Sequence, residues 1–326
     1  MTSLPFYNET REKMTRRDTL VMGGVLAATS LAAPRCLRAA SDPVALESVS
    51  EGAYVHQGAH EIMQPDNLGH IANVGFIIGD DSVAVIDSGG SAMHGRHLRE
   101  VIQSKTDRPI RYVIATHVHP DHLFGHAAFL QDDPIFVGHH KLPGALDARG
   151  AFYLDNLNDE FGVLASGTEV VKPDLLVEDE MILDLGNRPL TLKAHATAHT
   201  DNDLSVLDQR DGLLWAGDLL FMERCPVLDG RLLGWLDVLD ELQQIEAKMV
   251  VPGHGPISAA WPDALGAERR YLTRLRDEVR DFLAGGGLLD DVVETLTFED
   301  ERAAWQLFDE YHGRNVSAAY AELEWE

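Results

Sequence analysis

The sequence predicts an α/β fold in which mixed β-sheets are covered by helices. Short runs rich in β-branched residues, bounded by Gly, Asp and Pro, recur between residues 44 and 251 and are typical of strands. Segments with the apolar period of a helix lie between some of these runs, as at residues 94–102 and 236–245. After Pro262 the apolar pattern is almost wholly helical. Sheets with covering helices account for both periodicities.

The elements can be placed in chain order. The expected strands are residues 74–78, 83–86, 112–115, 135–137, 190–192, 204–207, 213–215 and 249–251. In the tail, helical residues run from 265 to a break at the glycines 285–287, and again through 303–308 and 318–323. We expect a main domain over residues 41–260, with residues 261–326 as a helical extension packed on it.

Residues 1–40 are expected to be a twin-arginine signal peptide. Arg16 and Arg17 precede an apolar run at residues 20–33, which is too short to cross a bilayer, and Ala39-Ala40 offers a cleavage site. A membrane anchor or an untargeted arm is the alternative. The leader predicts export to the periplasm by the twin-arginine route, with no stable membrane association after cleavage. Cys225 would then be the only cysteine, so no disulfide could form within the chain.

Composition and charge restrict the class of partner. The chain has 326 residues, of which 45% are hydrophobic, so it can bury a full hydrophobic core without disulfides or structural metal ions to stabilise it. Its 53 acidic and 27 basic side chains give a formal charge of −26, which repels a phosphate backbone. We therefore expect a small-molecule substrate and no nucleic acid.

The strongest chemical signal is the segment Thr116–His122, directly after an expected strand. Its H-x-H-x-D-H pattern crowds three imidazoles and a carboxylate into one turn, an arrangement that is unfavourable unless a cation binds them. In an extended segment His117 and His119 point the same way and can bind one ion. Asp121 and His122 are displaced toward a second position. The pattern predicts a metal site.

Three more candidate ligands, His199, Asp218 and His254, lie just past expected strands or in the loop between two. Each alone has an ordinary explanation, as a helix cap, a surface residue or a turn residue. Loops at strand ends can converge on one rim of a sheet, however. Together with the four residues above, they make seven ligands, a number that suits two ions and a bridging water.

These motifs resemble the metallo-β-lactamase fold hydrolases. The H-x-H-x-D-H run, the later histidine, the Gly-Asp pair and the Pro-Gly-His-Gly turn at residues 252–255 occur in that family's order, over about residues 44–256. The resemblance implies a four-layer αββα sandwich with a dimetal site at one edge, and here with additional C-terminal helices. It implies one ion held by His117, His119 and His199, another held by Asp121, His122 and His254, and Asp218 as the bridge. Asp87 matches a family aspartate that supports a ligand.

A narrower resemblance concerns a periplasmic subgroup. The leader, the GHHK stretch at residues 138–141 and the HGRN stretch at residues 312–315 are similar to the SoxH-like, or quinoprotein-relay, zinc metallohydrolases. This similarity leaves a periplasmic quinoprotein open as a partner.

The resemblance implies a zinc-dependent hydrolase with two Zn²⁺. A bridging hydroxide, oriented by Asp121, would attack an ester, thioester, lactone or related bond. Lactam-cleaving members generally lack a carboxylate at the position of Asp218, so β-lactam hydrolysis is less expected as the native task, although native or promiscuous β-lactamase activity stays open. A persulfide dioxygenase-like enzyme with one Fe²⁺ and a non-catalytic partner of a quinoprotein system also stay open.

Substrate contacts are expected from residues that follow the metal loop or lie in the tail. They are His139, His140, Lys141, Arg149, Tyr153, Arg314 and Asn315. A surface or packing role is the alternative for each. A positive cluster among them would suit an anionic substrate despite the acidic exterior.

Overall fold

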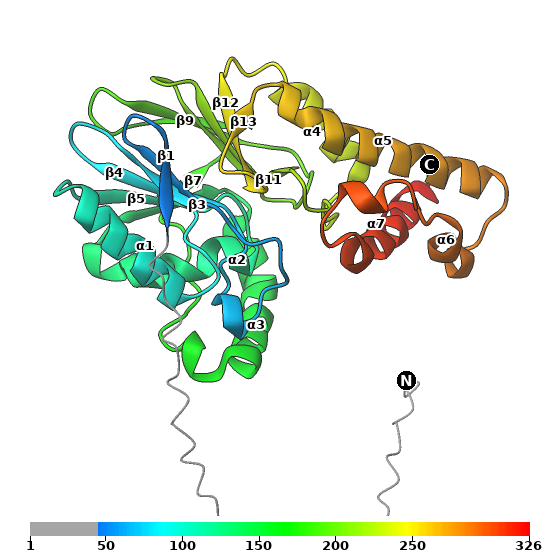
Figure 1. Ribbon diagram of the computed structural model, residues 1–326, viewed down its shortest axis with the longest axis horizontal. Coiled ribbons are helices and arrows are strands. Elements are labelled where there is room, and N and C mark those ends of the chain that lie inside the picture. Colours follow the sequence, from blue (N-terminus) through cyan, green and yellow to red (C-terminus); the bar gives the residue numbers. More distant parts are fainter. Residues whose placement is uncertain (1–44) are drawn as a thin grey trace, which may run out of the picture. The chain divides into compact units, whose positions relative to one another are not determined.

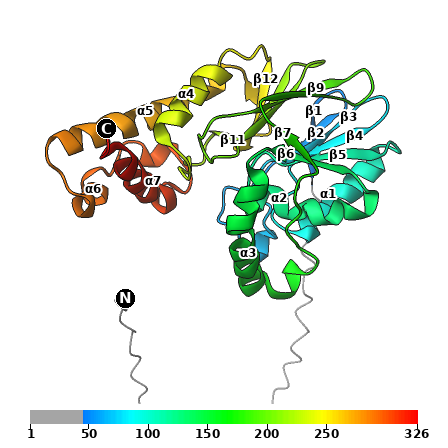
Figure 2. The ribbon, with the colours of Figure 1, turned by 180° about the vertical axis from the view of Figure 1, so that it is seen from behind.

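The computed structural model describes residues 45–326, and the expected leader lies outside this range. Two β-sheets pack face to face, with helices on their outer faces (Figures 1 and 2). The first sheet contains, in order, β1 (Leu46–Ser50), β2 (Ala53–His56), β3 (Val74–Ile78), β4 (Val83–Ile86), β5 (Ile110–Ile114), β6 (Ile135–His139) and β7 (Leu175–Val177). The second contains β13 (Ala259–Ala260), β12 (Met249–His254), β11 (Leu213–Phe221), β10 (Leu204–Asp208), β9 (Pro189–Ala194) and β8 (Glu180–Asp184).

Strand direction changes within each sheet. Strands β4 to β7 pair in parallel, as do β11 and β12, and the other neighbours are antiparallel. The segment after β5 and the last residue of β12 carry ligand candidates, because the carboxyl ends of parallel strands open onto one edge.

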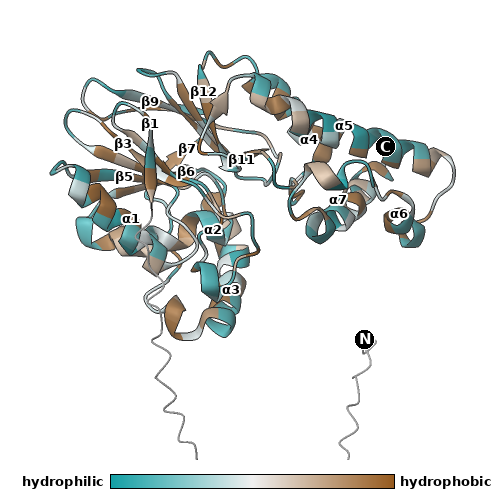
Figure 3. Ribbon diagram, viewed as in Figure 1, coloured by the Kyte–Doolittle hydropathy of each residue, from teal (hydrophilic) through white to brown (hydrophobic). Residues whose placement is uncertain are grey.

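Inner strands such as β4 and β11 separate two apolar layers. In β4, Ala84 and Ile86 face the core between the sheets, whereas Val83 and Val85 pack on the outer layer with Leu98 of α1 (Ala92–Lys105). Burial on both faces explains why these strands are continuous apolar runs rather than alternating ones. Figure 3 shows this as apolar colour concentrated on the strands.

Helices complete the four layers. The first sheet is covered by α1, α2 (Pro120–Leu123) and α3 (Leu142–Phe161), and the second by α4 (Leu232–Leu242) (Figure 1). The expected αββα sandwich is confirmed. None of the helices in the part of the chain that is described is long and apolar enough to cross a membrane.

The expected C-terminal helices are α5 (Gly266–Ala284), α6 (Leu289–Thr295) and α7 (Phe308–Leu323). Trp235 of α4, Leu220 of β11, Tyr271 of α5 and Val316 of α7 belong to one buried apolar cluster. The tail therefore shares its core with the second sheet and brings α7 to the site described below.

Candidate metal centre

Both sheets contribute side chains to a single cluster. His117, His119, Asp121 and His122 follow β5 of the first sheet, whereas His199 lies between β9 and β10, Asp218 lies in β11 and His254 ends β12. The cluster is thus a bridge between the two sheets, and the structure brings together all seven predicted ligands.

One group of side chains surrounds the inward nitrogen of His119. His119 Nδ1 lies 3.0 Å from His117 Nε2 and 3.0 Å from His199 Nε2. Asp218 Oδ2 lies 3.4 Å from His199 Nε2. These four side chains each offer one atom within 4.8 Å of the others, a spacing that can hold a metal ion.

The second group contains Asp121, His122 and His254. His254 Nε2 lies 3.4 Å from Asp121 Oδ2 and 3.4 Å from Asp218 Oδ2. Asp218 Oδ1 lies 3.1 Å from His122 Nε2. Asp218 therefore faces both groups, as a bridging carboxylate would.

Backbone carbonyls fix the orientation of two of the imidazoles. His199 Nδ1 lies 2.7 Å from the Val227 carbonyl oxygen, and His254 Nδ1 lies 2.7 Å from the Ile71 carbonyl oxygen. Because a carbonyl oxygen only accepts, His199 Nδ1 carries the proton, and its Nε2 presents a lone pair to the cluster. His254 Nδ1 also lies 2.9 Å from Arg224 Nη1, which only donates.

Carboxylates orient the imidazoles of two further histidines, His122 and His119. His122 Nδ1 donates to Asp87 Oδ2 at 2.8 Å, and His119 Nε2 lies 3.1 Å from Asp229 Oδ2. Asp87 is itself held by Thr116, whose backbone N–H and hydroxyl both donate to it at 2.8 Å. Such outer hydrogen bonds set the tautomer of metal-binding histidines.

Burial makes this arrangement costly without a cation. His117 and His199 are each 1% exposed. Burial lowers the pKa of His199 to about 4 and holds the pKa of His117 well below its usual value. Burial would raise the pKa of Asp218, but the neighbouring His254 and His122 lower it overall. Burial of His122 would lower its pKa, but Asp218, Asp87 and Asp121 raise it overall, and this negative charge would equally attract a metal ion. Imidazole nitrogens beside ionised carboxylates are a donor set that zinc prefers, so the residues fit divalent metal ions.

Two carboxylates that sequence patterns did not single out support the cluster. Asp229 accepts a hydrogen bond from Arg149 in addition to facing His119. Asp203 accepts from the backbone N–H of Thr200 at 2.8 Å and from its hydroxyl at 2.7 Å, which shapes the loop that carries His199. Burial raises the pKa of Asp203 to about 7. The Thr-x-x-Asp spacing is a local signal for such a turn.

A cleft of about 370 Å³ opens above the cluster. Its wall combines apolar residues with two guanidinium groups. The apolar residues are Ile62, Met63, Ile71, Phe221, Val227 and Leu228. The guanidinium groups belong to Arg224 and Arg314, and Arg224 Nη2 donates to the Tyr311 hydroxyl at 3.0 Å. Arg224 was not singled out from the sequence.

The predicted substrate residues divide between the cleft and other places. Tyr153 and Arg314 line the cleft, and Arg149 pairs with Asp229 at its edge. Asn315 instead accepts from the Leu228 N–H at 2.9 Å and donates to the Pro226 carbonyl at 2.7 Å, so it braces the segment beneath the cleft.

Three further predicted contacts, His139, His140 and Lys141, do not line this cleft in the described structure. His139 Nε2 lies 3.2 Å from the His195 carbonyl oxygen, and the Lys141 N–H donates to His139 Nδ1 at 3.0 Å. These contacts direct the His139 side chain into the fold at the end of β6. His140 and Lys141, which follow it, are not among the residues that line the cleft.

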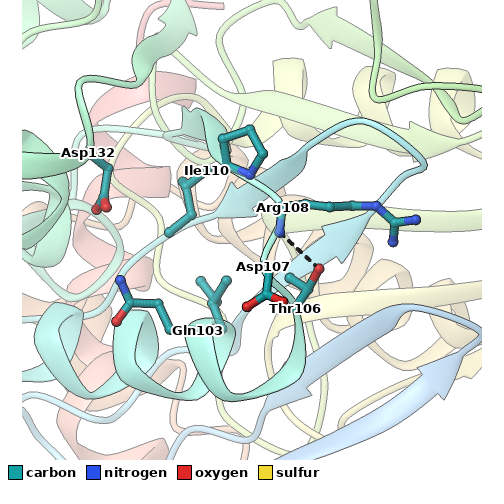
Figure 4. A pocket seen from close by; sticks show the side chains of 8 residues that line it. Gln103, Thr106, Asp107, Arg108, Ile110 and Asp132 are labelled. Atoms are coloured by element: carbon teal, nitrogen blue, oxygen red, sulfur yellow. Dashed lines mark hydrogen bonds between the residues drawn. The ribbon is translucent and has the colours of Figure 1, made fainter.

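A second pocket, of about 380 Å³, lies at the C-terminal end of α1, between Gln103, Arg108 and Asp132 (Figure 4). It contains none of the seven clustered side chains. Asp132 is paired with Arg99 at 2.6 Å. We therefore place the chemistry in the cleft above the cluster.

Fold and cluster together define a metallohydrolase-type protein, and comparison with known proteins identifies its family. The model of the metallo-beta-lactamase superfamily matches residues 68–254. The chain belongs to the metallo-β-lactamase superfamily.

Relatives within the superfamily differ in their reactions. The chain is 28% identical over 231 residues to the acyl-coenzyme A thioesterase MBLAC2 of Bos taurus, a match that covers 62% of this chain and 77% of that protein. It is 22% identical over 277 residues to a linear primary-alkylsulfatase of a Pseudomonas species, covering 72% of this chain and 51% of that protein.

Solved structures share the fold. A metallo-beta-lactamase from Pontibacter korlensis superposes with a TM-score of 0.57 at 19% identity, covering 70% of this chain and 98% of that one. The sec-alkylsulfatase Pisa1 from a Pseudomonas species superposes with a TM-score of 0.65 at 15% identity, covering 86% of this chain and 50% of that one.

Proposed function

We propose that this protein is a zinc-dependent hydrolase that cleaves a thioester or a related ester. The observation that carries the proposal is the set of inward nitrogens directed at Asp218 beneath an open cleft. His117, His119 and His199 would hold one Zn²⁺, Asp121, His122 and His254 a second, and Asp218 would contact both. One iron remains the alternative loading.

When bound, such ions would lower the pKa of a bound water toward 7 and polarise the scissile carbonyl. The protein's own residues would bind the substrate and orient the attacking water. Asp121 lies at the cleft, where its carboxylate accepts a hydrogen bond from the attacking water and orients it. We propose direct attack by this water without a covalent enzyme intermediate.

The cleft supports a substrate with an acyl part and an anionic part. Its apolar wall suits an acyl chain, and Arg224 and Arg314 suit a phosphate or carboxylate. An acyl-coenzyme A has both parts, and the relationship to MBLAC2 favours the same bond type.

A second candidate substrate is an alkyl sulfate. The guanidinium groups of Arg224 and Arg314 would also bind a sulfate ester by donating hydrogen bonds to it. The match to the linear primary-alkylsulfatase extends over 72% of this chain. Both substrates carry an anionic group beside an apolar chain. Turnover must therefore be compared on one panel that contains both substrate types.

The test is turnover by the full chain loaded with zinc, on matched acyl-coenzyme A, aryl ester, lactone, alkyl sulfate and β-lactam substrates. We expect thioester hydrolysis that chelation abolishes and zinc restores. In Asp121→Asn it should fall by about 10³-fold or more, whereas Asp237→Asn, an exposed α4 residue, should be unchanged. Dizinc protein that turns over none of the panel would contradict the proposal. Oxygen-dependent activity with one iron would favour the sulfur-oxidising alternative.

Export remains part of the proposal. If Arg16 and Arg17 direct twin-arginine transport, replacing both with lysine should keep the protein in the cytoplasm, as measured by cell fractionation. Periplasmic location of the double variant would contradict it.

A further inference from the structure

Three histidines outside the metal centre form a second imidazole cluster, called here the trihistidine cluster. His56 ends β2, His70 lies in the loop before β3, and His94 lies in the first turn of α1. The ring centroids of His70 and His94 are 3.6 Å apart, and that of His56 lies 5.5 and 5.4 Å from them. One ring nitrogen of each lies within 4.8 Å of the others.

Ring nitrogens of this cluster lack partners. His94 is 0% exposed, and within the described chain neither of its ring nitrogens has a hydrogen-bond partner. The same holds for Nε2 of His56 and Nε2 of His70, which are also buried. A buried polar atom left unpaired destabilises the fold. Because one nitrogen of each ring lies within 4.8 Å of the others, a single ion could be the common partner of the three rings.

The imidazoles are in the protonation state that binds metals. The Ala45 carbonyl oxygen lies 3.0 Å from His56 Nδ1 and can only accept, so Nε2 of that ring carries the lone pair. Burial, followed by the neighbouring His56 and His97, lowers the pKa of His70 to about 3. Burial and the neighbouring imidazoles likewise hold the pKa of His94 well below its usual value.

The backbone is shaped around this space. Gly89 has φ of +87°, and a Cβ there would lie 1.8 Å from His94 Nδ1, so only glycine allows the ring its position. Ser91 joins the loop to the helix, because its hydroxyl caps the His94 N–H at 3.2 Å and bonds the Leu68 carbonyl at 3.0 Å. The three rings are thus held in place by elements that are themselves fixed.

We propose that the trihistidine cluster binds a third metal ion, a divalent late first-row cation such as Zn²⁺. The donor set is three imidazoles with no carboxylate or thiolate, which suits zinc, copper or nickel and not magnesium or calcium. Three protein ligands leave one position of a tetrahedral ion for water. The ion would join β2, the loop before β3 and α1, and would therefore stabilise the fold. None of its ligands belongs to the centre beneath the cleft, so the proposal stands independently of the proposed function.

Zinc content tests the proposal directly. The full chain, saturated with Zn²⁺ and desalted, is measured by elemental analysis beside His70→Gln and His60→Gln. His70 is half-buried, and the control His60 lies outside the cluster, paired with Glu223. We expect wild type and His60→Gln to hold one zinc more per chain than His70→Gln. Equal zinc in all three would overturn the proposal. Should circular dichroism show that His70→Gln is unfolded, His56→Gln replaces it with the same expectation.

A second measurement separates this site from the metal centre. In a His199→Ala/Asp218→Asn/His122→Ala/His254→Ala background both groups of the centre lose ligands, and added Co²⁺ should still give the visible absorption of about one bound ion. Adding His70→Gln to that background should abolish the absorption. A background protein that binds no Co²⁺, or absorption that survives His70→Gln, would contradict a trihistidine metal site.

Discussion

Asp218 is the residue on which both halves of the cluster depend. Its two oxygens face His122 and His254 on one side and His199 on the other. Asp218→Asn keeps the shape of the side chain but removes the charge that would offset the two proposed cations. We expect activity to fall by about 10³-fold or more and zinc at the centre to fall with it. Parallel assays of turnover and zinc content check this, and normal values of both would refute the bridging role.

Asp229 acts one step further out, through His119. Asp229→Asn retains an oxygen that can accept from His119 Nε2 but loses the carboxylate charge that Arg149 and His119 share. Removing such an outer partner costs about 10–100-fold in metal affinity or activity. Zinc titration against a competing chelator should show the weaker binding, with Asp237→Asn as the matched surface control. Unchanged zinc affinity would mean that Asp229 does not position His119.

Buried neutral histidines predict acid sensitivity. Burial lowers the pKa of His195 and of His126 to about 3, whereas an unfolded histidine titrates near 6.5. Between these values the unfolded chain binds more protons, so stability is complete above about pH 6.5 and falls as the pH is lowered. Each group contributes up to about 1.4 kcal/mol per pH unit in that window.

Urea unfolding of the chelated protein at pH 7, 6 and 5 measures this slope. His195 Nε2 lies 2.8 Å from the Ser205 hydroxyl, so His195→Gln keeps a polar partner there but cannot titrate. The variant should lose less stability than wild type on acidification, whereas His60→Gln should follow wild type. Identical slopes for wild type and His195→Gln would rule out its contribution.

Among the elements, β11 differs most from expectation. The apolar run indicated a strand over residues 213–215, with Asp218 in the turn beyond it, but β11 continues to Phe221. Gly217 adopts φ of +53°, and the pairing of β11 with β12 shifts register around it. The irregularity turns Asp218 toward the cluster without ending the strand. A pattern of apolar residues cannot show such a bulge.

Gly253 of β12 packs directly against this irregularity. A Cβ there would lie 2.0 Å from Asp218 Oδ1 and 2.6 Å from the Gly217 carbonyl carbon. Gly253→Ala should therefore displace Asp218 and reduce activity by about 100-fold or more. Gly144→Ala in α3, where a Cβ meets nothing within 4 Å, should keep activity and gain up to about 1 kcal/mol of stability. Full activity of Gly253→Ala would show that β12 does not constrain Asp218.

Helix prediction succeeded where the apolar period was regular. The expected helices at residues 94–102 and 236–245 correspond to α1 and α4, whereas the stretch at 303–308 is only a 3-10 turn, Arg302–Ala304, before α7 begins. Helix α3 was not anticipated, although it provides Tyr153 to the cleft. Ligand spacing was informative because coordination demands particular residue types. No spacing pattern in the sequence marks Asp229 or Arg224, since only the folded chain brings them to the cluster.

At the scale of the whole molecule, the metal centre links the two sheets. Removing its ions should therefore weaken the packing of one sheet on the other. At free zinc about 100 times the Kd, one bound ion contributes about 2.7 kcal/mol, so its removal by chelation should lower the Tm by about 5 °C. Scanning calorimetry with and without chelator measures this, and His254→Ala should show a smaller shift. A Tm that is insensitive to chelation in both would contradict a metal link between the sheets.

Two consecutive residues connect the two imidazole clusters. The side chain of His70 belongs to the trihistidine cluster, and the carbonyl of Ile71 accepts the hydrogen bond that orients His254. An ion bound to His70 would also restrain this carbonyl, and we therefore expect the two proposed sites to affect each other's affinity for metal. Thermodynamic linkage then requires the influence to be mutual and equal: whatever factor the outer ion adds to zinc affinity beneath the cleft, the inner ions return to the outer site.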